Sequence, residues 1–226
     1  NQGYINASVN SVYSNNMSSN QQLINLAGAG APYDLCRISY STGNFTVQNG
    51  YESYPVIYVT WYGSVMYCNW LSQYEARQLC YNTNWGYDTI ANGYHLPTEA
   101  QWEYAARGNT GDSYPWGPVW DASRCANIEN RYNLGLGTAM VGSYDSGAST
   151  VTGIQDMAGN VWEWCNDWYA LYGSGAETNP VGAFIGSDRV LRGGSWSNGA
   201  DFVRVASRGL NGPTGSNYDI GFRVVR

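Results

Sequence analysis

Thiolates and imidazoles are the side chains that most often bind metals or act as nucleophiles and bases. The chain holds one histidine, His95, and five cysteines: Cys36, Cys68, Cys80, Cys125 and Cys165. No two cysteines form a Cys-x-x-Cys pair, so a structural zinc site is not expected. One imidazole excludes most histidine metal sites and most general-base schemes. Lysine is absent from the sequence, which excludes a P-loop, a Schiff base and a kinase-type lysine.

The spacing of Cys68 and Cys80 bears on disulfides. Apolar residues recur with a helical period from Ser64 to Cys80 and predict one helix with the two cysteines at its ends. At the rise of an α-helix they would lie about 18 Å apart, too far for a disulfide. We therefore expect a framework without disulfides, in which most cysteines are small buried apolar residues.

The charge balance is acidic, with a net charge of -6, and every basic residue is an arginine. Nucleic-acid binding needs a basic surface, so a nucleic-acid partner is not expected. No apolar run approaches the roughly 18 residues of a transmembrane helix. The sequence begins at Asn1 without a basic-then-apolar leader, so any export signal is expected to have been removed or to be absent.

Aromatic and turn-forming residues are abundant, with 20 Tyr, 10 Trp and 28 Gly. Tyr, Trp, Ser, Gly and Asn are enriched in binding surfaces, although most aromatic side chains of a globular protein belong to its core. Residues 1–31 are polar and rich in Asn and Ser, and we interpret them as an extension with a short helix. Residues 32–226 then form one domain.

The elements of this domain follow from local patterns. Thr98 and Gln101 fit a capping box at the start of a second helix, which Gly108 ends. Strands are expected at 37–40 and 54–60. After Gly108 only short aromatic segments separated by Gly, Asn and Pro remain, so the fold class is α+β, with two helices, short antiparallel strands and much irregular loop.

Several ordered motifs resemble the formylglycine-generating, sulfatase-modifying enzyme family. They are Tyr54–Leu71 with its YPV start and YCNWL end, Tyr94–Gly108 with LPTEAQWEYAARG, Asp156–Trp164 with GNVWEW, Arg189–Trp196 with RGGSW, and Ile220–Arg223 with GFR. The resemblance covers about residues 54 to 226. It implies the C-type-lectin-like fold of that family.

One departure from the family concerns its chemistry. The resemblance implies two cysteines shortly after the GGS-[YW] turn, where they bind copper and carry out the oxidation. Residues 197–203 contain no cysteine, and Ser or Asn does not replace a thiolate as a Cu(I) ligand. Related iron enzymes use several histidines, of which the chain has one. We therefore expect that the protein is not an enzyme, with a formylglycine-generating enzyme as the alternative.

The segment from residue 197 to residue 219 resembles the C-terminal variable region of diversity-generating-retroelement variable proteins. It mixes polar, glycine and apolar residues without a period, inside a region of about 190–226 whose ends read as structure. Val203, Arg204, Val205, Ala206 and Arg208 are interpreted as scaffold. The ligand-binding, diversified positions that the resemblance implies are Ser197, Asn198, Gly199, Asp201, Phe202, Ser207, Gly209, Leu210, Asn211, Gly212, Gly215, Asn217, Tyr218 and Asp219.

The resemblance also implies one metal site and no required cofactor. Asp156, Glu163 and the carbonyl groups of Gly159 and Val161 match positions that hold calcium in the enzyme family. Hard oxygen ligands on a turn suit Ca²⁺. The alternative is that Asp156 only caps a turn. Structural calcium is therefore the one cofactor expected.

Together these patterns favour a binding protein whose partner is an unidentified protein. Phe202, Leu210 and Tyr218 would be its apolar anchors. Three alternatives stay open: the enzyme already named, a lectin suggested by the fold alone, and a surface loop without function. A monomer is expected. The variable-protein resemblance implies the bacterial cell surface, with a lipid anchor in a segment before Asn1.

Overall fold

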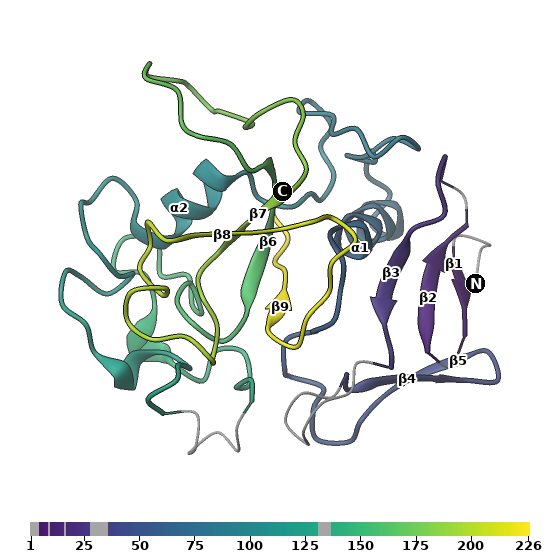
Figure 1. The fold of residues 1–226 in the computed structure, drawn as a ribbon, viewed down its shortest axis with the longest axis horizontal. Coiled ribbons are helices and arrows are strands. Elements are labelled where there is room, and N and C mark those ends of the chain that lie inside the picture. Colours follow the sequence, from purple (N-terminus) through teal and green to yellow (C-terminus); the bar gives the residue numbers. More distant parts are fainter. Residues whose placement is uncertain (1–4, 9, 16, 28–35, 131–136) are drawn as a thin grey trace.

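The computed structural model describes residues 5–8, 10–15, 17–27, 36–130 and 137–226. These ranges hold two α-helices, two short 3-10 helices and three small sheets, arranged as Figure 1 shows. The elements are β1 (Ile5–Ala7), β2 (Ser11–Ser14), β3 (Gln22–Asn25), β4 (Ile38–Ser41), β5 (Asn44–Val47), α1 (Trp61–Tyr74), α2 (Glu99–Arg107), η1 (Ala122–Arg124), η2 (Asp145–Gly147), β6 (Trp162–Trp168), β7 (Arg189–Arg192), β8 (Arg208–Asn211) and β9 (Ile220–Gly221). The predicted α+β class is confirmed.

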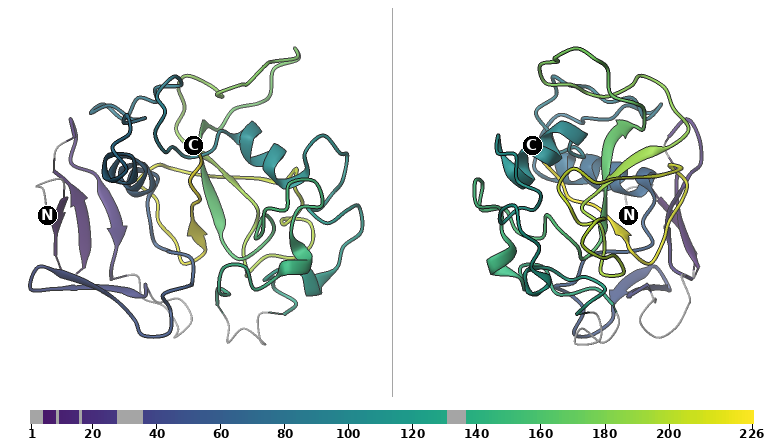
Figure 2. Two further views of the ribbon diagram at one scale, coloured as in Figure 1. Left: turned by 180° about the vertical axis from the view of Figure 1, so that it is seen from behind. Right: turned by 60° about the vertical axis from the view of Figure 1, so that its left-hand side comes forward.

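The N-terminal residues form a sheet, and the expected short helix is wrong. Strands β1, β2 and β3 pair antiparallel in that order, and Figures 1 and 2 show this sheet at one end of the molecule beside α1. A Cβ on Gly63 of α1 would lie 2.1 Å from the Leu23 carbonyl oxygen, so only glycine permits this contact. Val12, Leu23 and Leu26 are buried in the resulting cluster. The expected domain boundary at residue 31 lies outside the described residues.

Helix α1 begins where Thr60 joins it to β3. The Thr60 hydroxyl accepts from the Gly63 N–H at 3.0 Å and donates to the Gln22 carbonyl at 2.6 Å. The helix ends at Tyr74, six residues before the predicted end at Cys80, since Ala76 adopts φ 55°. Cys68 and Cys80 are therefore not at opposite ends of one helix. Both are buried in one cluster, and the helical rise no longer determines their separation.

Helix α2 confirms the capping box. The Thr98 side chain accepts from the Gln101 N–H, and the Gln101 side chain accepts from the Thr98 N–H at 2.8 Å. Gly108, with φ 60°, ends the helix. Glu99 in the first turn suits the helix dipole, and its carboxylate points toward β8, where it forms an ion pair described below.

A four-stranded sheet in the order β8-β7-β6-β9 forms the centre of the domain. Strands β8, β7 and β6 pair antiparallel, whereas β6 and β9 are parallel. Trp61 of α1 and Trp164 of β6 are almost completely buried in one cluster beside this sheet. The Arg189 guanidinium lies between the rings of Trp61 and Trp168, at 3.7 and 3.5 Å from their centroids. This cation–π sandwich fixes β7 against α1.

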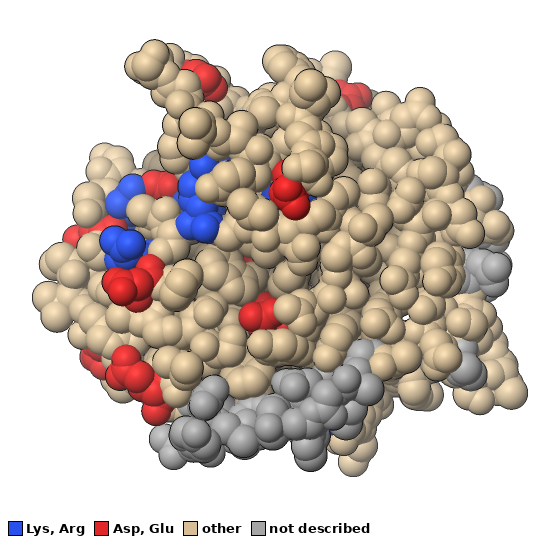
Figure 3. Space-filling model, in the orientation of Figure 1, with Lys and Arg blue, Asp and Glu red and all other residues tan. Residues whose placement is uncertain are grey.

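None of the described helices is long and apolar enough to span a membrane. The face seen in Figure 3 is largely uncharged, and its acidic and basic atoms gather toward the side that holds α2 and β8 in Figure 1.

Candidate functional site

The two ends of the segment 197–219 are held together at its base. The Asp219 carboxylate accepts hydrogen bonds from the Ser195 hydroxyl at 3.1 Å and the Ser197 hydroxyl at 3.4 Å. Next to this contact, the rings of Trp196 and Tyr218 pack with centroids 5.7 Å apart. We call these contacts the clasp. It closes the segment on the side of the β6–β9 pair, where the Trp162 N–H donates to the Asp219 carbonyl at 2.8 Å.

Two valines fix the first half of the segment from inside. Val203 and Val205 are both fully buried. Val203 packs with Tyr114 and Cys125, whereas Val205 packs with a cluster that includes Trp102 of α2. Each fully buried valine stabilises the fold by about 1.5–3 kcal/mol. The predicted role of these two residues as scaffold agrees with their burial.

Strand β8 fixes the second half of the segment and was not predicted. Arg208 donates to both carboxylate oxygens of Glu99, from Nε at 2.6 Å and from Nη2 at 2.8 Å. Its guanidinium also lies over the rings of Tyr169 and Tyr172, at 4.4 and 4.2 Å. Burial with a bidentate partner makes this a strong ion pair. No local pattern predicts this ion pair, because 109 positions separate its two residues.

The exposed side chains of the segment lie between these fixed points. Phe202 is 56% exposed and Leu210 is 51% exposed, so both offer apolar surface to solvent. The other predicted positions fall into three groups: Asp201 and Asn217 are exposed; Ser197, Asn198, Gly199, Ser207, Gly209, Asn211, Gly212, Gly215 and Tyr218 are partly buried; and Asp219 is buried.

Three predicted positions depart from the expectation of tolerant surface sites. Asp219 is only 8% exposed and holds the clasp. Tyr218 packs on Trp196 and is partly buried. A Cβ on Gly209 would lie 3.1 Å from a ring carbon of Trp162 and 3.2 Å from Leu191. These three residues support the framework, because their replacement would disturb packing inside the domain.

The four predicted calcium ligands lie on the turn before β6 and on its first residues. Both oxygens of Glu163 are engaged: Arg223 donates to them at 2.5 and 2.6 Å, and Trp102 Nε1 donates at 2.6 Å. Asp156 accepts from the Gly142 N–H at 2.7 Å, and burial raises the pKa of its carboxyl. Glu163 is not placed to bind a calcium ion, because the Arg223 guanidinium already neutralises its carboxylate.

The other two predicted ligands are backbone carbonyls. Gly159 takes φ 72°, and a Cβ there would lie 2.0 Å from the Ala126 carbonyl oxygen, so the turn is close-packed. Val161 is buried. Across the described ranges, no group of three or more His, Cys, Asp or Glu side chains is placed to hold a metal. Calcium binding stays a prediction.

The cysteines and the histidine are not placed for catalysis at the segment. All five cysteines are free, and four of them are buried. Burial raises the pKa of Cys125 to about 12 and that of Cys165 well above its usual range, which disfavours the thiolate. His95 stacks on Tyr87 with ring centroids 5.2 Å apart, and burial lowers its pKa.

The residues that follow the Gly-Gly-Ser turn, where the enzyme family has its cysteines, carry hydroxyl, carboxylate and amide groups. Asn198 accepts from the Ser195 N–H at 3.0 Å and the Ser195 hydroxyl at 2.9 Å. The Ser195 hydroxyl also reaches Asp219. These hard donors do not fit the copper that the family resemblance implies, because Cu(I) prefers soft thiolates.

The arrangement of the sheet, helices and loops defines a C-type-lectin-like protein of α+β class. Treponema denticola variable protein 1 has a similar structure, with a TM-score of 0.69 and 26% identity over 96% of this chain and 91% of that one. The model of the sulfatase-modifying factor enzyme 1-like domain matches residues 21–226. The chain belongs to the family of this domain, and the predicted fold and family resemblance are confirmed.

Two relatives show the range of proteins that contain this domain. The serine/threonine-protein kinase Pkn1 of Chlamydia trachomatis is 37% identical over 84% of this chain, but the chain spans 27% of that protein. A formylglycine-generating enzyme of Streptomyces coelicolor is 34% identical over 77% of this chain, which spans 53% of the enzyme. The chain thus spans about half, or less, of these two relatives.

The relatives also correct one expectation. From the missing cysteine pair we expected a protein that is not an enzyme. Formylglycine-generating enzymes from several organisms are relatives at 32–34% identity. The family therefore contains enzymes, and the expectation that this protein is not an enzyme is wrong. The cysteine pattern describes one site of this chain and does not decide what the whole protein does.

Proposed function

We propose that the exposed residues of the segment 197–219 form a surface that binds a protein partner. One observation carries the proposal: Phe202 and Leu210 are half exposed, while Val203, Val205 and Arg208 between them are anchored in the domain. A rigid backbone that presents exposed apolar side chains loses little conformational entropy when it binds. Such anchors resemble the few residues that dominate protein interfaces.

The surroundings of the segment suit a protein partner. Most of the face in Figure 3 is uncharged, and its charged groups lie toward α2 and β8. Such groups suit the rim of an interface, which is polar, whereas the core of an interface is depleted of charge. Asp201 and Asn217 are exposed polar neighbours in the same segment, and short polar side chains adapt readily to a partner. The likeness to Treponema denticola variable protein 1 supports a segment whose exposed residues vary.

Binding is tested by replacing Phe202 and Leu210 together with Ser. The wild-type protein and this double variant are each used to capture cell-surface proteins from the microbial community in which the protein occurs. Quantitative mass spectrometry identifies the captured proteins. We expect the captured partner to be lost and the melting temperature to fall by less than about 2 °C, since both side chains are exposed. The matched control replaces Phe184 and Ile185, which are 94% and 84% exposed outside the segment.

Two outcomes would overturn the proposal. If the control double variant loses the same partner, capture reflects general surface hydrophobicity. If the Phe202 and Leu210 variant unfolds, these residues support the core. Diversification is tested separately by sequencing the gene region for residues 190–226 in many related cells. We expect changes at Phe202 and Leu210 and none at Val203 or Val205, next to a reverse transcriptase gene.

Formylglycine-generating activity is a second candidate, favoured by the relative that is 34% identical. It predicts copper uptake and thiol-dependent oxygen consumption on a sulfatase peptide. Oxygen consumption that survives replacement of Phe202 and Leu210 would separate this activity from partner binding. Display at the bacterial cell surface stays a prediction from the variable-protein resemblance.

A further inference from the structure

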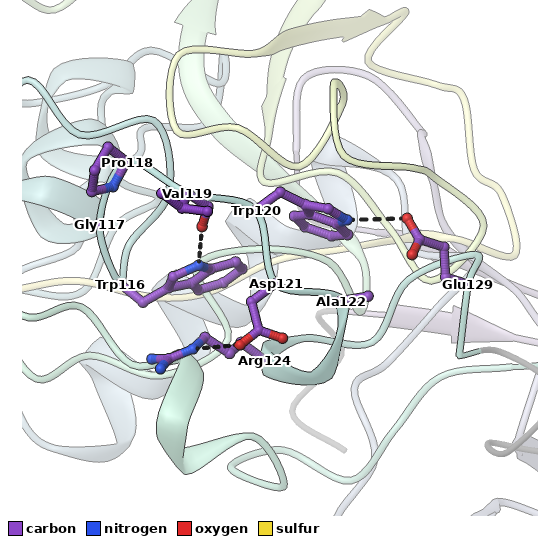
Figure 4. Close-up of a pocket in the computed structure, with 9 residues that line it drawn as sticks. All are labelled: Trp116, Gly117, Pro118, Val119, Trp120, Asp121, Ala122, Arg124 and Glu129. Carbon is purple, nitrogen blue, oxygen red and sulfur yellow. Dashed lines mark hydrogen bonds and ion pairs between the residues drawn. The ribbon is translucent and has the colours of Figure 1, made fainter.

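A shallow pocket lies on the fixed part of the domain beside the segment 197–219. Its volume is about 540 Å³, and it is lined by Trp116, Gly117, Pro118, Val119, Trp120, Asp121, Ala122, Arg124 and Glu129, as Figure 4 shows. The Ile128 N–H next to Glu129 donates to the Asn198 carbonyl at 3.0 Å. The pocket is therefore connected to the start of the segment but uses none of its residues.

The two indole rings of the pocket are fixed in place. Trp116 Nε1 donates to the Val119 carbonyl at 3.0 Å, and Trp120 Nε1 donates to Glu129 Oε1 at 3.1 Å. The rings lie 6.1 Å apart between centroids, and Tyr114 stacks on Trp116 at 5.3 Å. Because both N–H groups are used, the partly exposed indoles offer a ligand no hydrogen-bond donors. They offer only the ring surface that Tyr114 and the neighbouring indole leave uncovered.

The residues that the structure describes around the pocket carry an excess of negative charge. Asp121 pairs with Arg124 at 3.1 Å, so these two charges compensate each other. Glu129 is exposed and accepts only from Trp120, and among the described residues no cation pairs with it. The described lining of the pocket therefore combines two fixed indole rings with one carboxylate that no described cation pairs with. Rings of this kind attract a cation placed within about 6 Å of their centroids.

We propose that this pocket binds an alkylammonium group, such as a quaternary trimethylammonium or a lysine side chain. The methylene or methyl groups contact Trp116 and Trp120, and the positive charge faces Glu129. A sugar fits less well, since the pocket gives it few free hydrogen-bond partners. The proposal does not depend on partner binding at Phe202 and Leu210, because the pocket lies outside the segment.

The test uses small probes with the full chain. Choline is titrated and binding is followed by saturation-transfer NMR of its methyl protons. The neutral isostere 3,3-dimethylbutan-1-ol has the same shape without the charge, and N-acetyl-lysine amide presents a primary ammonium. We expect choline to bind at least about fivefold more tightly than its neutral isostere. The lysine probe and phosphatidylcholine vesicles then show whether a peptide or a lipid headgroup is the better source of the cation.

Variants locate the binding. Glu129→Gln keeps an oxygen that accepts from Trp120 but removes the charge, and Trp120→Leu removes one π face. We expect each to weaken choline binding at least about fivefold. Glu129→Gln should leave the melting temperature of the protein almost unchanged, whereas Trp120→Leu should lower it, because Trp120 packs on Tyr114 and Trp116. The matched control is Glu177→Gln, an exposed carboxylate outside the pocket. The Phe202 and Leu210 double variant keeps choline binding, which separates this pocket from the proposed partner surface.

Three results would overturn the proposal. Equal binding of choline and its neutral isostere would make the pocket a purely apolar site. Binding of a monosaccharide such as glucose, with no binding of choline, would make it a sugar site. Choline binding that Glu129→Gln and Trp120→Leu leave unchanged would place the cation elsewhere on the protein.

Discussion

Arg208 of β8 and Glu99 of α2 form a bidentate ion pair, with Nε–Oε1 at 2.6 Å and Nη2–Oε2 at 2.8 Å. Glu99 is 6% exposed, so the pair is largely shielded from water. It joins the segment 197–219 to the first turn of a helix that is distant in sequence. The second half of the segment is therefore held as firmly as a structural strand.

Replacement of Arg208 by Ala should destabilise the protein by about 2–3 kcal/mol, because hydrogen bonds to a buried charge are lost. Urea unfolding followed by fluorescence measures this change. Arg204→Ala is the matched control, since Arg204 is exposed and donates only to the Asp201 carbonyl; its cost should stay within about 0.5 kcal/mol. Equal costs for the two variants would show that the Arg208 pair contributes no more than a surface contact.

Gly209→Ala should destabilise the protein by about 1–3 kcal/mol, because the added methyl group overlaps Trp162 and Leu191. Gly212→Ala is the control. Its nearest neighbour would be Asp188 at 4.0 Å, so the methyl group has room. Thermal unfolding compares the two. If Gly209→Ala does not change the stability, Gly209 is a surface position that tolerates substitution, as the sequence predicts.

Glu163→Gln should cost about 3 kcal/mol because it leaves the Arg223 guanidinium without its partner. The loss should be the same in calcium chloride and in a chelator. Glu75→Gln, which disturbs the exposed pair with Arg77, is the control and should change the stability much less, because solvent screens exposed charges. A loss that occurs only with calcium present would identify Glu163 as a calcium ligand, as the sequence predicts.

Asp167 gives the protein a pH dependence. Burial raises the pKa of its carboxyl from 3.8 to about 6, so the folded state holds a proton that the unfolded state has already released. The stabilisation is complete below pH 3.8 and is lost as the pH rises through about 6. Asp167→Asn can still accept from the Glu99 N–H, which Asp167 does at 2.8 Å.

We therefore expect the variant to gain stability relative to the wild type between pH 4 and pH 7, by about 2 kcal/mol. Urea unfolding across this range measures the difference. A difference that does not change with pH would mean that Asp167 is ionised throughout in the folded protein.

Local patterns predicted the elements whose stabilising contacts are local. The capping box of Thr98 and Gln101 lies within one turn, so α2 could be placed from the sequence. Helix α1 was extended too far because its end depends on distant contacts: the Ser72 hydroxyl accepts from the Tyr94 N–H at 2.7 Å, 22 positions away. The strands β1–β3 are short and polar and depend on α1, so their periodicity was too weak to detect.

For the candidate site too, local patterns predicted some residues, and contacts between distant residues were missed. The exposed Phe202 and Leu210 could be found because structured stretches flank an irregular one. The role of Asp219 could not, since its hydrogen bond to Ser195 joins residues 24 positions apart. The pocket formed by Trp116, Trp120 and Glu129 was also missed, because indole rings in a sequence are more often part of a core.

The clasp between Ser195 and Asp219 also bears on how many residues the segment 197–219 can gain or lose. With both ends of the segment joined, residues inserted between Gly212 and Gly215 would enlarge a loop that the framework has already closed. Doubling the length of a flexible loop costs only about 0.6 kcal/mol. Insertions and deletions at this tip should therefore persist in natural populations alongside substitutions.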